Sequence, residues 1–160
     1  MDRHGLSYLH PNLFQEPIMN AVNTTPSAIP AIGRLLLAAI FIISGFGKLM
    51  APAGTIGYIA SAGLPFAPLA FAVAVAVELG GGLLLVAGFK TRYVAAILAL
   101  FSLVTAFAFH GNVSDQNQMI HLLKNIAMAG GLLQVVAFGA GSWSVDAIGV
   151  RKATGQAARA

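Results

Sequence analysis

Four apolar segments dominate this chain, and each approaches the length that an α-helix needs to cross a bilayer. They cover approximately residues 32–50, 69–88, 93–110 and 119–140. A helix needs about 20 predominantly apolar residues to span the hydrocarbon core. Residues 72–77 alternate Ala with Val, but both are apolar, whereas a strand of a membrane barrel alternates apolar with polar residues. The segment lengths therefore predict an all-α integral membrane bundle of four helices.

The composition supports a membrane protein and excludes several kinds of chemistry. Only 9% of the 160 residues are charged, whereas a soluble domain carries roughly 25%. The chain has no cysteine, which excludes disulfides, thiol redox chemistry and thiolate-bound metals or clusters. The net charge of +4 is spread between the apolar segments and forms no basic patch. It therefore indicates orientation in a membrane and no nucleic-acid partner.

The polar flanks divide the chain into one membrane domain and two tails. Residues 1–30 contain four prolines and no apolar run, so they are predicted to be a flexible tail. Translation could start at Met1 or at Met19. Residues 31–147 are predicted to be the four-helix domain, and residues 148–160 a basic C-terminal tail.

The distribution of Lys and Arg predicts the orientation of the bundle. Four spans place both termini and the turn between the second and third helices on one side. That side carries all of the Lys and Arg residues except Lys48 and Lys124. Because positive residues concentrate in cytoplasmic segments, both termini are predicted to be cytoplasmic, with Arg34 as one orientation determinant. The connection 51–68 is rich in Pro and Gly and is predicted to be a loop with room for a partial turn.

Glu78 lies near the middle of the second apolar segment, at membrane depth. An ionisable group there costs about 2.5–3.5 kcal/mol on insertion scales, so it is expected to face protein and to have a partner. Ala70, Ala74 and Gly82 share its helix face, and such small residues let a neighbouring helix approach closely. Glu78 is therefore predicted to lie on a packed face. There it either has a function or joins two helices as a hydrogen-bonded or neutral carboxyl.

Further polar residues are predicted to converge with Glu78 in the outer half of the bundle, because span order places them near the outer helix ends. They are Lys48, His110, His121, Lys124 and Asn125. The last three are spaced i, i+3 and i+4 and therefore share one helix face. Lys48 and Lys124 are the candidate counter-ions of Glu78. Lys124 is preferred, because Lys48 is close enough to the interface to extend its ammonium into water.

No metal site is predicted. His110 and His121 flank a loop that contains Asp115, but they show no fixed ligand spacing such as H-E-x-x-H. Two histidines at the membrane interface are the stronger interpretation.

Several short motifs occur along residues 31–147 in a combination that is more specific than any one of them. They are Gly-Arg-Leu-Leu-Leu at 33–37, Ser-Gly-Phe-Gly-Lys-Leu at 44–49, Gly-Leu-Pro at 63–65, Glu-Leu-Gly-Gly-Gly-Leu-Leu-Leu at 78–85, Gly-Phe-Lys-Thr-Arg at 88–92, His110, Lys124-Asn125 and Ser-Val-Asp at 144–146. In these motifs the chain resembles the DoxX family. The resemblance implies a four-helix protein of the bacterial inner (plasma) membrane. It supports five of the polar positions above but assigns none of them a catalytic role. These are Lys48, Glu78, His110, Lys124 and Asn125.

The resemblance also implies a function, because the family is named after a subunit of a thiosulfate:quinone oxidoreductase. The chain is accordingly predicted to be a redox- or quinone-associated membrane subunit, with a quinone as its candidate cofactor. It would need a soluble or membrane oxidoreductase partner for the redox centre, because the sequence shows no haem, flavin or thiolate site. Two alternatives stay open: transport of a proton or small solute, and a structural membrane scaffold without catalysis. Transport would favour a homo-oligomer in the lipid bilayer, because four helices with short loops make only a small pathway.

Overall fold

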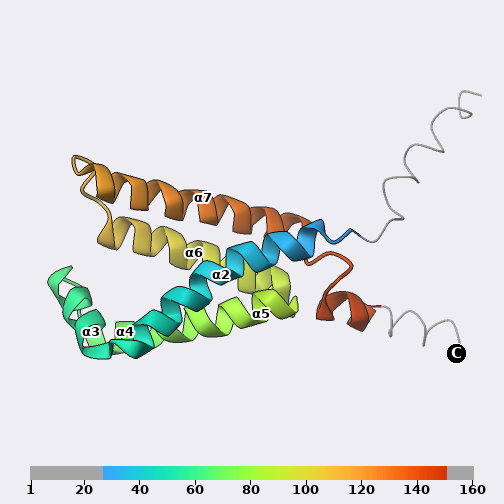
Figure 1. The fold of residues 1–160 in the computed structure, drawn as a ribbon, viewed down its shortest axis with the longest axis horizontal. Helices are drawn as coiled ribbons and strands as arrows, with labels where there is room; N and C mark the ends of the chain where they lie inside the picture. The colour runs from blue at the N-terminus through green and yellow to red at the C-terminus, as the bar shows by residue number, and fades with distance from the viewer. Residues whose placement is uncertain (1–26, 151–160) are drawn as a thin grey trace, which may run out of the picture.

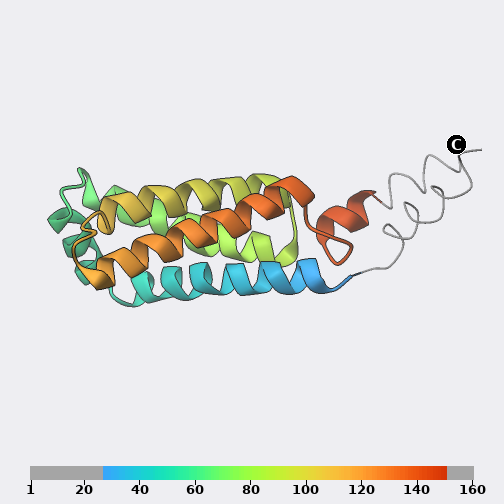
Figure 2. The same ribbon diagram turned by 90° about the horizontal axis from the view of Figure 1, so that it is seen from above.

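The computed structural model describes residues 27–150, and all regular structure in that range is helical. Four stretches are long and apolar enough to cross a membrane (Figures 1 and 2). They are α2 (Ile29–Met50), a second span made of α4 (Ala67–Val75), the π-helix η2 (Ala76–Gly80) and α5 (Gly81–Ala87), then α6 (Thr91–Phe109) and α7 (Gln116–Phe138). The predicted all-α fold with four membrane spans is confirmed. Most of both predicted tails, with Met1 and Met19, lies outside the described residues.

Local sequence explains where several helices begin and end. α2 has Pro30 in its first turn, where the missing N–H has no helical partner to lose. α7 begins after Asp115, whose carboxylate accepts a hydrogen bond from the Gln118 backbone N–H at 2.9 Å. α5 ends at Gly88, whose φ of +67° is a left-handed conformation that glycine adopts without a steric penalty.

The connection between the first two spans differs from its prediction. Residues 52–61, predicted to lie in a loop, form the ten-residue helix α3 (Pro52–Ser61). The prolines and glycines that indicated a loop are compatible with a helix here, because Pro52 stands at its first turn, and Gly63, with φ of +77°, follows its last. Ile59 is only 4% exposed, so α3 packs one side against the bundle.

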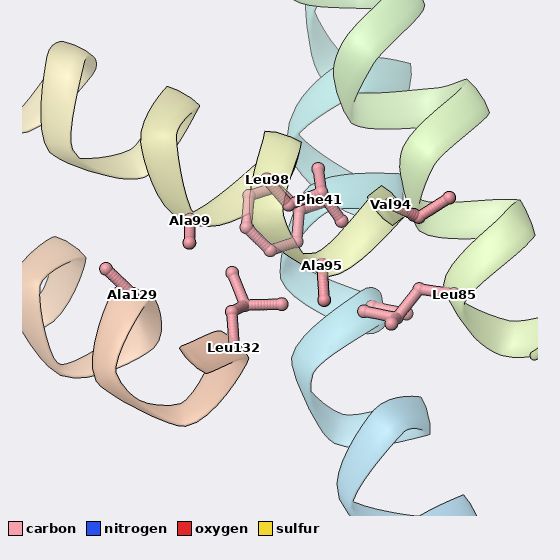
Figure 3. Packing of buried hydrophobic residues seen from close by; sticks show 9 residues of the cluster. Phe41, Leu85, Val94, Ala95, Leu98, Ala99, Ala129 and Leu132 are labelled. Carbon is pink, nitrogen blue, oxygen red and sulfur yellow. The ribbon is translucent and has the colours of Figure 1, made fainter. Parts of the chain in front are cut away.

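The hydrophobic core lies where α2, α5, α6 and α7 meet (Figure 3). Leu85, Leu98 and Leu132 are fully buried there. Ala95 and Ala99 of α6 are also buried, and these small side chains let α6 and α7 approach closely along their length. Most other large apolar side chains are exposed on the outside of the bundle, which is the surface that a bilayer would cover.

The two ends of the bundle differ in how tightly they close. At one end, which we call the α3 end, the backbones of α6 and α7 lie side by side. They diverge there from the backbones of α2, α3 and α4 (Figure 1). The opposite end holds the start of α2, the turn between α5 and α6, and residues 139–150 after α7; we call it the Arg34 end.

Buried polar contacts close the Arg34 end. Arg34 is 2% exposed, and its Nη2 donates a hydrogen bond to the Trp143 carbonyl at 2.6 Å. Asp146 accepts hydrogen bonds from the backbone N–H of Lys90 (2.8 Å) and from both the N–H and the hydroxyl of Thr91 (2.9 and 2.7 Å). The segment after α7 is thereby tied to the turn before α6. Arg34 is thus a packed structural residue in addition to its predicted role in orientation.

Candidate ligand cavity

A cavity of about 540 Å³ lies at the α3 end, between the α6–α7 pair and the helices α2, α3 and α4. Most of its wall is apolar, with Phe41, Ile59 and Phe101 among the lining residues. The wall also includes every polar residue that the sequence placed in the candidate cluster. These are Lys48, Glu78, His110, His121, Lys124 and Asn125. The structure therefore brings the six residues to one cavity from three helical stretches, α2, η2 and α7, and from the end of α6.

An ion pair in the cavity wall joins α2 to η2. Lys48 Nζ donates to Glu78 Oε1 at 2.9 Å and lies 2.8 Å from Oε2. Ser44 completes the group, because it accepts a hydrogen bond from Lys48 Nζ at 2.7 Å and donates one to Glu78 Oε1 at 3.1 Å. The Glu78 side chain is 7% exposed and that of Lys48 is 25% exposed. The carboxylate is thus buried next to a cation that keeps partial access to the cavity.

This pairing corrects two sequence-based predictions. Lys124 was preferred as the counter-ion of Glu78, but Lys48 is its partner. Lys48 was expected to extend toward water, whereas its ammonium turns inward. The physical reason is position along the helix: Lys48 is four residues from Ser44 on the face of α2 that contacts η2, so a short reach brings Nζ to the carboxylate.

Two local features of the sequence place Glu78 against α2. Glu78 lies in the π-helix η2, a local widening of the second span that is frequent at functional sites. Opposite it, Gly45 leaves room for the close approach, because a Cβ there would lie 2.8 Å from Leu79 Cγ and 3.1 Å from Glu78 Cβ. The predicted packed face is also seen at Ala74, which is 9% exposed.

Two histidines of the cavity lining lie against each other. The rings of His110 and His121 stack with their centroids 5.0 Å apart and their planes 22° apart. His110 Nδ1 lies 2.7 Å from Gln118 Oε1. An amide oxygen only accepts, so Nδ1 carries the proton in this contact and Nε2 is the acceptor in a neutral ring. In residues 27–150 no group of three or more His, Asp or Glu side chains is arranged to hold a metal ion.

Lys124 and Asn125 continue the polar face of α7 beyond His121. Asn125 Nδ2 donates a hydrogen bond to the His121 carbonyl one turn earlier, at 3.0 Å. Lys124 forms no ion pair with any residue of the described part of the chain. Its ammonium is therefore the cavity's uncompensated charge.

The sequence of the chain matches a known protein family. The DoxX family model matches residues 29–111, which is more than half of the chain. The chain belongs to the DoxX family. The resemblance that the motifs indicated is confirmed.

Two relatives of this DoxX protein are inner membrane proteins of Escherichia coli (strain K12). The chain is 36% identical to the inner membrane protein YqjF over 115 residues, which cover 72% of this chain and 87% of the relative. It is 38% identical to the inner membrane protein YphA over 121 residues, which cover 72% of this chain and 86% of the relative. No solved structure matches. With its four spans, this DoxX protein is a multi-pass protein of the inner membrane.

The family match divides the residues that line the cavity. Lys48, Glu78 and His110 fall within residues 29–111 of this DoxX protein, whereas the polar face of α7 lies beyond the match. The carboxylate and its counter-ion therefore lie in the part of the chain that the family model matches. The extra cation, Lys124, belongs to the segment outside it.

Sequence analysis missed two groups in the cavity wall. Ser44 bridges Lys48 and Glu78, and its position four residues before Lys48 was the available signal. Tyr58 of α3 stacks on Phe109 of α6, with ring centroids 5.4 Å apart. No signal pointed to that contact, because residues 51–68 were predicted to be a loop.

Proposed function

We propose that this DoxX protein is a redox-associated membrane subunit that holds a quinone headgroup in the cavity at the α3 end and acts with a partner that carries the redox centre. The observation that supports it most is the cavity itself. It has the size of a small-molecule site, which is roughly 300–1,000 Å³, and combines an apolar wall with a few convergent polar groups.

The donors and acceptors of the cavity fit a quinone. A quinone presents a flat apolar ring and two carbonyl oxygens, and it would supply two-electron, two-proton redox chemistry when bound. The Lys124 ammonium can donate a hydrogen bond to a carbonyl oxygen, and the His121 ring can donate through a protonated nitrogen. The Glu78 carboxylate, held by Lys48 Nζ and Ser44 Oγ, is a buried acceptor that can take up a proton.

The direct test measures quinone bound to the purified protein. The full chain is purified in mild detergent and examined by native mass spectrometry, before and after addition of a short-chain quinone. We expect a one-to-one adduct, and extraction of the co-purified lipid should release quinone. A protein that stays free of adduct at saturating quinone contradicts the proposal.

A matched pair of variants locates the bound quinone. Ala70 of α4 lines the cavity, whereas Ala72 on the same helix is exposed on the outside. Ala70→Leu fills part of the cavity and is expected to remove the adduct, while Ala72→Leu keeps it. Equal loss in both variants, or in neither, means that the quinone binds elsewhere.

The partner is tested separately by crosslinking the protein in its native membrane. We expect an oxidoreductase subunit with a flavin, haem or iron–sulfur centre to be captured through the residues of the α3 end. Capture of self-copies alone argues against an accessory role.

A structural role is the second candidate, and the ion pair supports it. Lys48 and Glu78 join α2 to the second span through a contact of 2.8 Å. If Glu78→Gln lowers the melting temperature while quinone binding to the remaining folded protein is unchanged, the pair acts as a scaffold.

A further inference from the structure

The polar part of the cavity wall carries more positive than negative charge. Two ammonium groups line the cavity, on Lys48 and Lys124, and Glu78 is the single carboxylate among the lining residues. Lys48 lies 2.8 Å from the carboxylate and is compensated by it. Lys124 remains, so the wall has a net charge of +1 when both histidines are neutral.

No other carboxylate of the described residues compensates Lys124. Besides Glu78 these residues contain two, on Asp115 and Asp146, and neither lies within 4 Å of Lys124. Asp115 caps the first turn of α7, and nine residues of helix separate it from Lys124, which is about 13 Å along the axis. Asp146 is bound to Lys90 and Thr91 at the Arg34 end.

The groups around Lys124 add donors and no negative charge. His121 stands one turn before it and stacks on His110, and Asn125 turns its amide N–H to the backbone. From α6 the cavity is lined by the apolar side chains of Phe101 and Val104 and by the neutral hydroxyls of Ser102 and Thr105. Lys124 is itself exposed, so an anion beside it is held most strongly where the apolar wall of the cavity excludes water from the contact.

From this charge balance we infer that the cavity selects an amphiphile whose headgroup bears one negative charge on oxygen, and that Lys124 is its counter-ion. The apolar body occupies the space between α2, α4 and α6, and the anionic oxygen lies beside Lys124, within reach of His121. A long-chain carboxylate is the simplest example. The inference rests on the same cavity as the proposed function but not on a quinone being its occupant.

The test compares two ligands of equal chain length, one with an anionic carboxylate headgroup and one with a neutral hydroxyl. Binding of hexadecanoate and of hexadecanol to the detergent-solubilised full chain is measured at pH 8 by native mass spectrometry titration. A charge-assisted contact contributes about 1.5–3 kcal/mol, which corresponds to a preference of roughly 10- to 100-fold for the acid. Equal affinity for the acid and the alcohol overturns the inference.

Substitutions at two lysines assign that preference to a residue. Lys124→Met should reduce it to about twofold or less, whereas Lys124→Arg should keep it. Lys90→Met, at the Arg34 end and outside the cavity, is the matched control and should behave as the parent chain. A preference that survives Lys124→Met, or that Lys90→Met also removes, overturns the inference. If Lys124→Met does not fold, Lys124→Gln takes its place, and Ala70→Leu must still remove acid binding.

A neutral decyl-substituted quinone separates this inference from the proposed function. Quinone binding with no preference for the acid refutes the charge selection and leaves the proposed function in place. Preferential binding of the acid with no quinone adduct supports the charge selection and refutes the proposed quinone site.

Discussion

Each end of this bundle holds a cationic side chain in a polar contact, but the two ends surround it differently. At the Arg34 end, Arg34 is 2% exposed and donates to a backbone carbonyl, and the residues after α7 are packed onto it. At the α3 end, the Lys48 side chain keeps 25% of its exposure and borders a cavity of about 540 Å³. The Arg34 end is thus closed and joins three segments of the chain. The α3 end is open, because its polar groups line a cavity. Substitutions at the closed end should mainly affect stability, and those at the open end should mainly affect ligand binding.

The largest effect is expected from Arg34→Ala. The substitution removes the hydrogen bond to the Trp143 carbonyl and leaves a void against Gly88, which contacts the guanidinium. Losing a hydrogen bond from a charged donor costs about 1.5–3 kcal/mol, and the cavity left by a truncated buried side chain adds to it, so we expect a large fall in the melting temperature in detergent. Ligand affinity of the protein that remains folded should stay within about twofold of the parent. If Arg34→Ala instead abolishes ligand binding and leaves the melting temperature unchanged, the Arg34 end serves binding and its structural role is refuted.

Asp146 gives the closed end a dependence on pH. Burial by itself would raise the pKa of Asp146, but the hydrogen bonds from Thr91 and Lys90 and the attraction of Arg34 outweigh it and hold the pKa below its usual value. Because the pKa is lower in the folded chain, this stabilisation is present above the pKa of the unfolded chain, near 4. It is lost as the pH falls through the lower, folded value.

The corresponding variant is Asp146→Asn, which replaces an acceptor of three hydrogen bonds by an amide. We expect a loss of about 1.5–3 kcal/mol at neutral pH, because the bonds to a charged acceptor weaken. The difference in melting temperature between the parent and the variant should shrink below about pH 4. A constant difference down to pH 2.5 would show that the Asp146 charge contributes nothing.

At the open end, Lys48→Met should destabilise less than Arg34→Ala and change binding more. Glu78 loses its counter-ion but keeps the Ser44 hydroxyl, and it can stay neutral by binding a proton. We expect a stability loss of about 1–2 kcal/mol, smaller than for a fully buried pair because Lys48 is partly exposed. Affinity for a cavity ligand should fall, measured by the same native mass spectrometry titration. Stability lost to the extent seen for Arg34→Ala would mean that the two ends are equally structural.

The contrast between the ends also explains what the sequence could and could not predict. The four spans follow from segment length and apolar composition, which fix helices in lipid almost independently of tertiary contacts. The polar residues that line the cavity follow from span order. The partner of Glu78 does not, because it depends on how α2 is rotated and on the π-helix η2, and neither leaves a periodic signal. Helix α3 was missed because proline and glycine interrupt a pattern without deciding whether a short helix lies between them.

The smallest effect is expected from Gly45→Ala, which tests how closely α2 must approach η2. An added Cβ would lie 2.8 Å from Leu79 Cγ, and the flexible Leu79 side chain can move aside. We therefore expect a loss of about 1 kcal/mol, at the lower end of the range for overpacking. Gly47→Ala is the matched control, because nothing lies within 4 Å of a Cβ at that position. If Gly45→Ala lowers ligand affinity while Gly47→Ala does not, the helix separation at Gly45 sets the geometry of the Lys48–Glu78 pair. If the two variants are alike in affinity and melting temperature, the pair forms without close packing, and its geometry comes from Ser44 and η2 alone.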